Sequence, residues 1–126
     1  MTVRIITNDK VVQKMTKIEC ILRPNVILEL KNALGKLGIK GMTVTEAIGF
    51  GLQKGQKGEN WNTELNINLL PKTKIELVVS DNRVDQVVQV IIKTARTGKI
   101  GDGKIFTYPI GNAIRIRTGE TGESAI

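Results

Sequence analysis

A repeated unit, in which an apolar strand leads into an amphipathic helix, constrains the fold of this chain more than any other feature. The letters KIE open an apolar stretch at residues 17–19 and again at residues 74–76. After each stretch, apolar residues recur at spacings of three and four, the period of a helix that buries one face. The predicted elements, in chain order, are a strand at 17–22, a helix beginning at Pro24, strands at 42–50 and 73–80, a helix at 81–97, and strands at 104–109 and 113–118.

Two strand–helix–strand units of this size indicate one α+β domain. They predict a ferredoxin-like double βαβ sandwich, in which a four-stranded antiparallel sheet carries both helices on one face. At 126 residues the chain has the length of a single domain. Because the strands are rich in Ile, Val and Leu, we expect the uncovered face to expose a large apolar patch that oligomerisation covers.

The charge balance favours an anionic partner, and the residue content excludes several kinds of site. The chain carries 19 Lys and Arg against 12 Asp and Glu, no His, and the single cysteine Cys20. The net charge of +7 suits nucleic acid, a phosphorylated ligand or an acidic surface. Without His, imidazole catalysis and His metal sites are excluded, and a lone cysteine forms no internal disulfide. Because the chain has no apolar run near ~18 residues and no long apolar leader, we expect a cytoplasmic protein without membrane insertion.

A glycine-rich segment at 98–104, GKIGDGK, has the spacing G-x-x-x-x-G-K of a phosphate-binding P-loop. A P-loop follows a strand and precedes a helix, whereas this segment has the reverse order, and Ile105 replaces the Ser or Thr that binds magnesium. The local chemistry still suits an anion, because glycines let N–H groups form a nest and Lys99 and Lys104 add positive charge. Asp102 is out of place there and needs a pairing role. The alternative is a helix C-cap followed by a plain turn.

Two arginines follow this segment, Arg115 and Arg117, on the predicted strand at 113–118. Residues two apart on a strand point the same way, so the two guanidinium groups would form a second cationic element. Guanidinium groups suit phosphate oxygens because they donate in a planar fork. The alternative is an ordinary solvated strand face.

These motifs, in this order, resemble those of the PII signal-transduction family, the nitrogen-regulatory proteins. The resemblance covers residues 17–126 and rests on TGKIGDGKIF followed by IRIRTGE, with GMTVTEAIGFG, QKG and LPKTKIE also in register. It implies a cytoplasmic homotrimer that regulates other proteins and is not an enzyme. It divides the chain into a loosely held N-terminal extension at 1–16 and a PII domain at 17–126, with a T-loop at 51–70, a nucleotide-binding B-loop at 96–104 and a C-terminal loop at 115–126.

The resemblance also implies the ligands. PII proteins bind ATP or ADP competitively in clefts between subunits, and ATP with Mg²⁺ permits binding of 2-oxoglutarate. The implied nucleotide-binding residues are Ile21, Thr43, Gly49, Gly51, Glu76, Val78, Gly101, Asp102, Gly103, Lys104, Phe106, Arg115 and Arg117. Among these, Ile21, Thr43, Gly49, Glu76 and Val78 match positions that contact the adenosine, with Thr43 and Val78 near the base and Glu76 near the ribose. Residues 101–104 would hold the phosphates, joined by Arg115 and, from the facing side of the cleft, by Arg117. The implied 2-oxoglutarate-binding residues are Gln53, which also ligates Mg²⁺, Lys54, Gly55, and Lys72, which pairs with the far carboxylate.

The T-loop implies a regulated target: an ammonium transporter, a nitrogen-assimilation enzyme or a transcription factor. Three expected contact positions depart from the family. Leu65 replaces a tyrosine that is uridylylated, Thr63 stands at a serine that is phosphorylated, and Trp61 replaces an arginine that plugs the transporter channel. An exposed Trp suits a hydrophobic anchor for a partner, and the alternative is a Trp folded back onto its own trimer. Leu52 replaces an arginine that helps to hold the nucleotide.

Three other functions remain open from the sequence. A small basic nucleic-acid-binding domain would need aromatic residues on its strands, and only Phe50, Phe106 and Tyr108 qualify. A nucleotide hydrolase would need a base other than His, and no nucleophile–base pair is evident. A divergent PII-like sensor that binds adenine nucleotide but has lost 2-oxoglutarate is favoured by Leu52 and disfavoured by Gln53 and Lys72.

Overall fold

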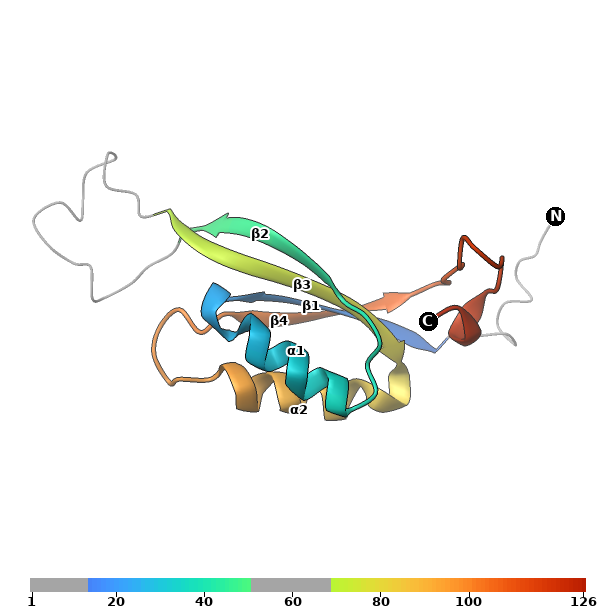
Figure 1. The fold of residues 1–126 in the computed structure, drawn as a ribbon, viewed down its shortest axis with the longest axis horizontal. Coiled ribbons are helices and arrows are strands. Elements are labelled where there is room, and N and C mark those ends of the chain that lie inside the picture. The colour runs from blue at the N-terminus through green and yellow to red at the C-terminus, as the bar shows by residue number, and fades with distance from the viewer. Residues whose placement is uncertain (1–13, 51–68) are drawn as a thin grey trace, which may run out of the picture.

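A single antiparallel sheet forms the centre of the molecule in the computed structural model, which describes residues 14–50 and 69–126. The sheet has the order β2-β3-β1-β4, and all neighbouring strands run antiparallel. Helices α1 and α2 lie together on one face of it (Figure 1). The strands are β1 (Met15–Leu22), β2 (Thr43–Gly49), β3 (Leu70–Ser80) and β4 (Lys104–Ile110), and the helices are α1 (Ile27–Lys36) and α2 (Val84–Ala95). The predicted ferredoxin-like double βαβ fold is confirmed.

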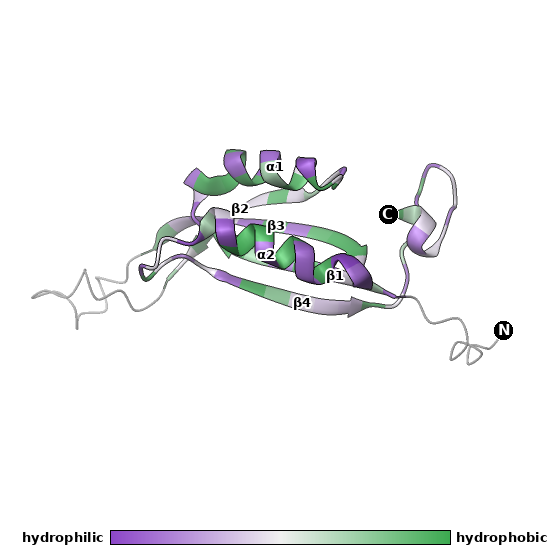
Figure 2. Ribbon diagram, turned by 90° about the horizontal axis from the view of Figure 1, so that it is seen from below, coloured by the Kyte–Doolittle hydropathy of each residue, from purple (hydrophilic) through white to green (hydrophobic). Residues whose placement is uncertain are grey.

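The core lies between the sheet and the two helices. Alternate residues of β1 and β3 point into it, and each helix adds residues spaced by four, as its period requires. Figure 2, seen from the helix side, shows apolar residues recurring along both helices. The buried core comprises Ile18, Cys20, Leu22, Leu30, Leu34, Ile75, Leu77, Val79, Val87, Ile91 and Ala95. No helix within the described ranges is long and apolar enough to cross a membrane.

The end of α1 is shaped by a glycine, and this end later forms part of the candidate site. Gly38 has a φ of +83°, a conformation that glycine adopts without strain. The Gly38 N–H donates to the Gly35 carbonyl at 3.0 Å, and the Ile39 N–H donates to the Leu34 carbonyl at 3.2 Å. This is the Schellman pattern that terminates a helix. The Arg83 guanidinium also donates to the Leu37 carbonyl, so the start of α2 holds the end of α1.

One predicted strand is wrong. Residues 113–118 form no strand of the sheet; instead Ile114 makes an isolated bridge with Thr121, and a turn lies between them. The Asn112 side-chain oxygen accepts the N–H groups of Ala113 and Gly122 at 2.9 and 3.0 Å. A side chain that binds backbone groups in this way competes with a strand ladder, which the alternating sequence alone does not reveal.

Smaller differences concern the ends of elements. β1 begins at Met15, so the last two residues of the expected extension belong to the sheet. β3 begins at Leu70, three residues earlier than predicted. Each helix opens with a short 3₁₀ turn, at Pro24–Val26 and Asp81–Arg83, and α2 ends at Ala95 rather than at residue 97.

The uncovered face of the sheet is more polar than predicted. Strand register places Lys17 and Glu19 of β1 beside Glu76 and Val78 of β3, and Phe106 and Tyr108 of β4 on the other side of β1. The Ile, Val and Leu residues of the central strands mostly occupy the alternate positions, which face the helices. The expected large aliphatic patch on this face is therefore wrong, and charged pairs occupy much of the centre of the face instead.

Candidate functional site

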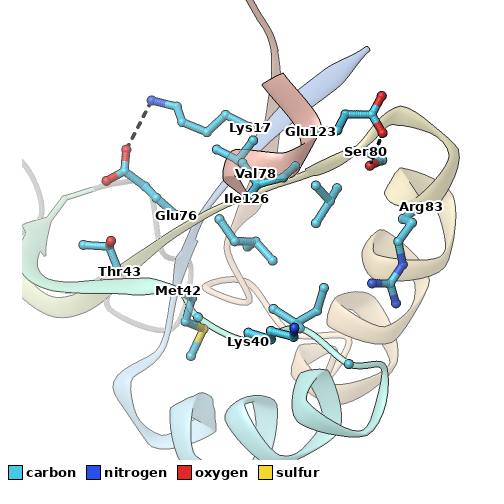
Figure 3. Close-up of a pocket in the computed structure, with 15 residues that line it drawn as sticks. Lys17, Lys40, Met42, Thr43, Glu76, Val78, Ser80, Arg83, Glu123 and Ile126 are labelled. Carbon is cyan, nitrogen blue, oxygen red and sulfur yellow. Dashed lines mark hydrogen bonds and ion pairs between the residues drawn. The ribbon is translucent and has the colours of Figure 1, made fainter. Parts of the chain in front are cut away.

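Two hollows contain most of the described residues that were expected to bind nucleotide. The first, here called the α1–β2 hollow, has a volume of about 730 Å³ and lies between the α1–β2 connection and the open face of β3. Thr43, Glu76 and Val78 all line it, as expected for the base and ribose side (Figure 3). Lys17, Arg83, Glu123 and Ile126 complete its wall, so the last residues of the chain lie at the same opening.

The second, the glycine-loop hollow, has a volume of about 530 Å³ and lies at the other end of the strands. The end of β2, the start of β3 and the loop between α2 and β4 (residues 96–103, here called the glycine loop) surround it. Its lining includes seven of the predicted site residues: Ile21, Gly49, Lys72, Gly101, Asp102, Gly103 and Lys104. Thr43, Glu76 and Val78 therefore lie apart from the expected phosphate-side residues of the same chain. Ile21 and Gly49, which were also expected to contact the adenosine, lie beside those phosphate-side residues.

The glycine loop is closed around the carboxylate of Asp102. The backbone N–H groups of Thr97 and Gly98 each donate to it at 2.8 Å, and the Thr97 hydroxyl and the Arg23 guanidinium donate as well. The Thr97 hydroxyl, the arginine and the backbone donors together hold the pKa of Asp102 well below its usual range. The pairing role that the sequence demanded for Asp102 is thus present, and it is directed into the loop.

Two glycines give this loop its shape. Gly101 and Gly103 have φ values of +106° and +105°, which residues with a side chain rarely adopt. A Cβ atom on Gly103 would lie 1.9 Å from the carbonyl oxygen of Ile21. The loop therefore runs directly against the backbone of β1, and only glycine fits at this position.

Lys72 lies in the glycine-loop hollow beside the loop itself. Its ammonium group donates to the Gly101 carbonyl at 3.2 Å. Its side chain also covers Gly49, where an added Cβ atom would meet the Lys72 Cγ at 3.1 Å. Lys72, Lys99 and Lys104 thus bring three cationic side chains to one hollow. Within the described ranges, none of the three makes an ion pair with a carboxylate.

The α1–β2 hollow is organised by a different charge pair. Lys17 of β1 donates to the Glu76 carboxylate of β3 at 3.2 Å (Figure 3) and lies 4.7 Å from the centre of the Tyr108 ring. The lysine of the first KIE unit thus pairs with the glutamate of the second. The sequence repeat indicated two similar units, but it did not predict that their charged residues bind each other.

The two arginines do not form the strand face predicted for them. The Arg115 guanidinium donates to Glu120 at 3.1 Å, inside the C-terminal turn, and Arg117 is exposed in that turn. Phe106 lies on the open face of β4 and is partly exposed. None of these three residues lines either hollow of the single chain.

Several predicted positions lie outside the described residues: Gly51, Leu52, Gln53, Lys54, Gly55, Trp61, Thr63 and Leu65. Among described residues, no group of three or more His, Cys, Asp or Glu side chains is placed to hold a metal ion.

Sequence reasoning missed Arg23 and Thr97, which bind Asp102. The signal was available in part, because an acidic residue in a cationic loop requires a donor. The distance of Arg23 along the chain concealed which donor it is.

Comparison with known proteins shows the family. Residues 15–120 match the family of nitrogen regulatory protein P-II. The chain is 51% identical over 112 residues to nitrogen regulatory protein P-II of Pasteurella multocida and to P-II 1 of Escherichia coli K12, covering 89% of this chain and 100% of each relative. Two solved structures superpose with a TM-score of 0.75 each. One is the GlnK–ATP complex of B. subtilis, at 42% identity with 89% of this chain and 95% of that chain covered. The other is Arabidopsis thaliana PII bound to citrate, at 43% identity with 90% and 94% covered. This chain therefore belongs to the nitrogen regulatory P-II family.

Proposed function

We propose that this protein is a signal-transduction regulator of nitrogen and carbon metabolism that binds ATP or ADP and, with Mg-ATP, 2-oxoglutarate. It acts as a cytoplasmic homotrimer, and the T-loop at 51–70 controls the target protein. The observation that carries the proposal is the division of the expected nucleotide residues between the α1–β2 hollow and the glycine-loop hollow. A nucleotide needs both sets at once, so a second copy of the chain has to supply one of them.

Each hollow suits one end of a nucleotide. The glycine-loop hollow combines three lysines with a turned glycine backbone, which suits phosphate oxygens. The α1–β2 hollow combines Thr43, Val78 and Met42 with the Glu76 carboxylate, which suits a base and a ribose hydroxyl. Arg115 and Arg117 would join the phosphates, with Arg117 reaching them from the facing side of the cleft.

Magnesium fits this site as a metal that arrives with the nucleotide. The carboxylate that lines the glycine-loop hollow belongs to Asp102, which Arg23 and Thr97 already bind. Mg²⁺ commonly takes phosphate oxygens and water as ligands rather than an all-protein cage. Phosphate oxygens, 2-oxoglutarate and Gln53 would therefore hold it, and Lys72 would neutralise the far carboxylate of the keto acid.

Calorimetric titration tests the ligands. We expect Mg-ATP to bind, and 2-oxoglutarate to bind only when Mg-ATP is present. If nucleotide binds and 2-oxoglutarate never does, the protein is the divergent adenine-nucleotide sensor. If nucleotide fails to bind at all, the proposal is wrong.

Mixed trimers test the shared cleft. Thr43→Trp would fill the α1–β2 hollow, and Lys104→Glu would repel phosphate from the glycine-loop hollow. We expect each variant alone to lose Mg-ATP binding. Co-refolded mixtures should regain it, because every mixed trimer contains a cleft built from the intact side of each variant. A site within one chain predicts no recovery on mixing.

A nucleic-acid-binding function has less support from the geometry. Phe106 and Tyr108 do lie on the open face, but the Lys17 ammonium already lies over the Tyr108 ring. Glu19 and Glu76 share that face and would repel a phosphate backbone. Binding of RNA that weakens steeply with salt would revive this alternative.

A further inference from the structure

The glycine loop is fastened to the rest of the molecule by one arginine, Arg23. This residue directly follows β1, and its side chain is half-buried. One guanidinium nitrogen donates to the Asp102 carboxylate and lies 3.5 Å from the Thr97 hydroxyl, and the other donates to the Ile100 carbonyl at 3.0 Å. Arg23 thus binds three residues of the loop although it precedes Asp102 by 79 positions.

The contacts divide the charges of the loop into two groups. The Asp102 carboxylate is bound within the loop by the Thr97 and Gly98 N–H groups and by Arg23. Lys99 and Lys104 line the glycine-loop hollow and are left without a carboxylate partner in the described part of the chain. Arg23 itself does not line that hollow. The Arg23 guanidinium therefore neutralises the Asp102 carboxylate and binds the Ile100 carbonyl, and it is not directed at a ligand in the hollow.

We propose that Arg23 is a positioning residue for the nucleotide site: it binds Asp102 and the Ile100 carbonyl and thereby holds the loop, with its lysines and glycine backbone, toward the phosphates. It touches no ligand. Asp102 is accordingly an internal counter-ion and not a ligand of phosphate or metal. This inference rests on the proposed nucleotide binding, and it adds a residue that the expected binding set does not contain.

An ordinary surface ion pair would contribute little, since exposed pairs are typically weak. Arg23 differs because its planar fork satisfies a carboxylate and a backbone carbonyl simultaneously, and a lysine cannot reproduce this geometry. Gly103 supports the same arrangement, because a Cβ atom there would meet the Ile21 carbonyl, so the loop runs close to the end of β1 that Arg23 follows. The Thr97 hydroxyl and, after it, the Arg23 guanidinium lower the pKa of Asp102, so the carboxylate stays charged beside the arginine.

The test compares Arg23→Lys and Arg23→Gln with wild type by calorimetric titration of Mg-ATP. We expect both variants to weaken binding by about tenfold, a loss typical of a hydrogen bond to a charged group. Failure of Arg23→Lys to restore binding separates positioning from general attraction, because lysine keeps the charge. Lys31→Gln removes a positive charge from an exposed position of α1 that lines neither hollow, and this variant should bind as wild type does.

A double-mutant cycle with Asp102→Asn adds a second criterion. If Arg23 acts through Asp102, the double variant should lose no more Mg-ATP affinity than the single variant with the larger loss. The contrary result is an additive loss, which would mean that each residue contacts the nucleotide by itself. Full binding by Arg23→Lys would also overturn the proposal.

A readout without nucleotide keeps the two proposals separable. The amide protons of Thr97 and Gly98 should exchange slowly in wild type and at least about tenfold faster in Arg23→Gln, because loss of the arginine loosens their acceptor. Normal nucleotide binding with unchanged exchange in Arg23→Gln overturns the role of Arg23 alone. Absence of nucleotide binding in wild type overturns the proposed function, whatever the exchange rates show.

Discussion

Two glycine-containing loops of this molecule carry cations, and they are held in opposite ways. In the loop before β4, Asp102 is bound by Arg23, which lies 79 residues earlier in the chain. In the C-terminal turn, Asn112 binds Ala113 and Gly122, and Glu120 binds Arg115, so these contacts stay within ten residues. The distant contact comes only after the turn, where the Ser80 hydroxyl donates to Glu123. The first loop is fastened by tertiary structure, whereas the second is a local device.

The difference concerns which cations are ready to meet a ligand. Arg23 neutralises Asp102 and leaves Lys99 and Lys104 with no acidic partner among the described residues. Among the described residues no arginine of another element pairs with the C-terminal turn, and its Glu120 instead binds Arg115, which was itself expected to contact phosphate. In the proposed nucleotide complex, Arg115 would exchange a carboxylate for a phosphate, whereas Lys99 and Lys104 would have no such partner to give up among the described residues.

The largest effect should come from Gly103→Ala. The added Cβ atom would collide with the Ile21 carbonyl at 1.9 Å, and the φ of +105° would be strained. We expect unfolding free energy to fall by more than about 2 kcal/mol, measured by urea denaturation, together with loss of Mg-ATP binding.

Gly119→Ala in the C-terminal turn is the matched control for this change. Gly119 has a φ of +77° but nothing within 4 Å of its Cβ position. Its cost should stay near about 1 kcal/mol. Equal costs at the two sites would remove the distinction between the loops.

The next largest effect should come from low pH, which protonates Asp102 and so breaks the contacts that hold the glycine loop. Since the folded pKa of Asp102 is lowered, its contribution is present above the unfolded pKa of ~3.9 and is lost only as the pH falls through the lower folded value. The Asp102 carboxyl carbon and the Thr97 amide, followed by NMR, should therefore titrate below ~3.9 in wild type. In Arg23→Gln the midpoint should rise. A wild-type midpoint at the ordinary value would contradict the bonding described here.

Asn112→Ala should act more weakly and more locally. It removes the acceptor of two backbone N–H groups, but the residue is exposed and water can replace it. We expect about 1 kcal/mol of lost stability, and faster amide exchange confined to residues 113–122. Asn112→Asp keeps the oxygen and should restore protection. Faster exchange at Thr97 as well would show that the two loops are coupled.

The smallest effect should follow Glu120→Gln, and its sign is informative. Losing the charge releases Arg115 from an exposed ion pair, so Mg-ATP should bind more tightly by up to about fivefold, the range of such pairs. Glu29→Gln on α1 removes the same charge from an exposed helix position and should leave binding unchanged. Weaker binding in Glu120→Gln would mean that Glu120 orients Arg115 instead of competing for it.

Much of the fold followed from periodicity. The KIE repeat, the helical spacing of Leu30 and Leu34, and the apolar run of β3 predicted the elements. The two leucines and alternate apolar residues of β1 and β3 are buried. The prediction failed at 113–118, where alternation indicated a strand. There the Asn112 side chain accepts hydrogen bonds from the backbone, and in the described residues β4 is the last strand of the sheet, so residues 113–118 do not pair with it. The expected apolar open face failed because composition does not reveal which alternate positions of a strand face the helices.

The candidate site divided in the same way. The glycine loop, Lys72 and the Thr43–Glu76–Val78 set could be chosen from the sequence, and the structure gathers them into two hollows. The pairings of Arg23 with Asp102 and of Lys17 with Glu76 could not be chosen. Each joins residues of separate elements, and any of several cations would satisfy the same acid.

The sequence by itself determined where most strands and helices lie and which of their faces enter the core. It also showed where the backbone needs glycine and where cationic side chains gather. These properties depend on neighbours within a few positions, and the chain encodes them locally. Only the tertiary structure decided which charges meet. An ion pair depends on where strand register and helix packing bring two distant side chains, and that placement is fixed by burial of the whole core.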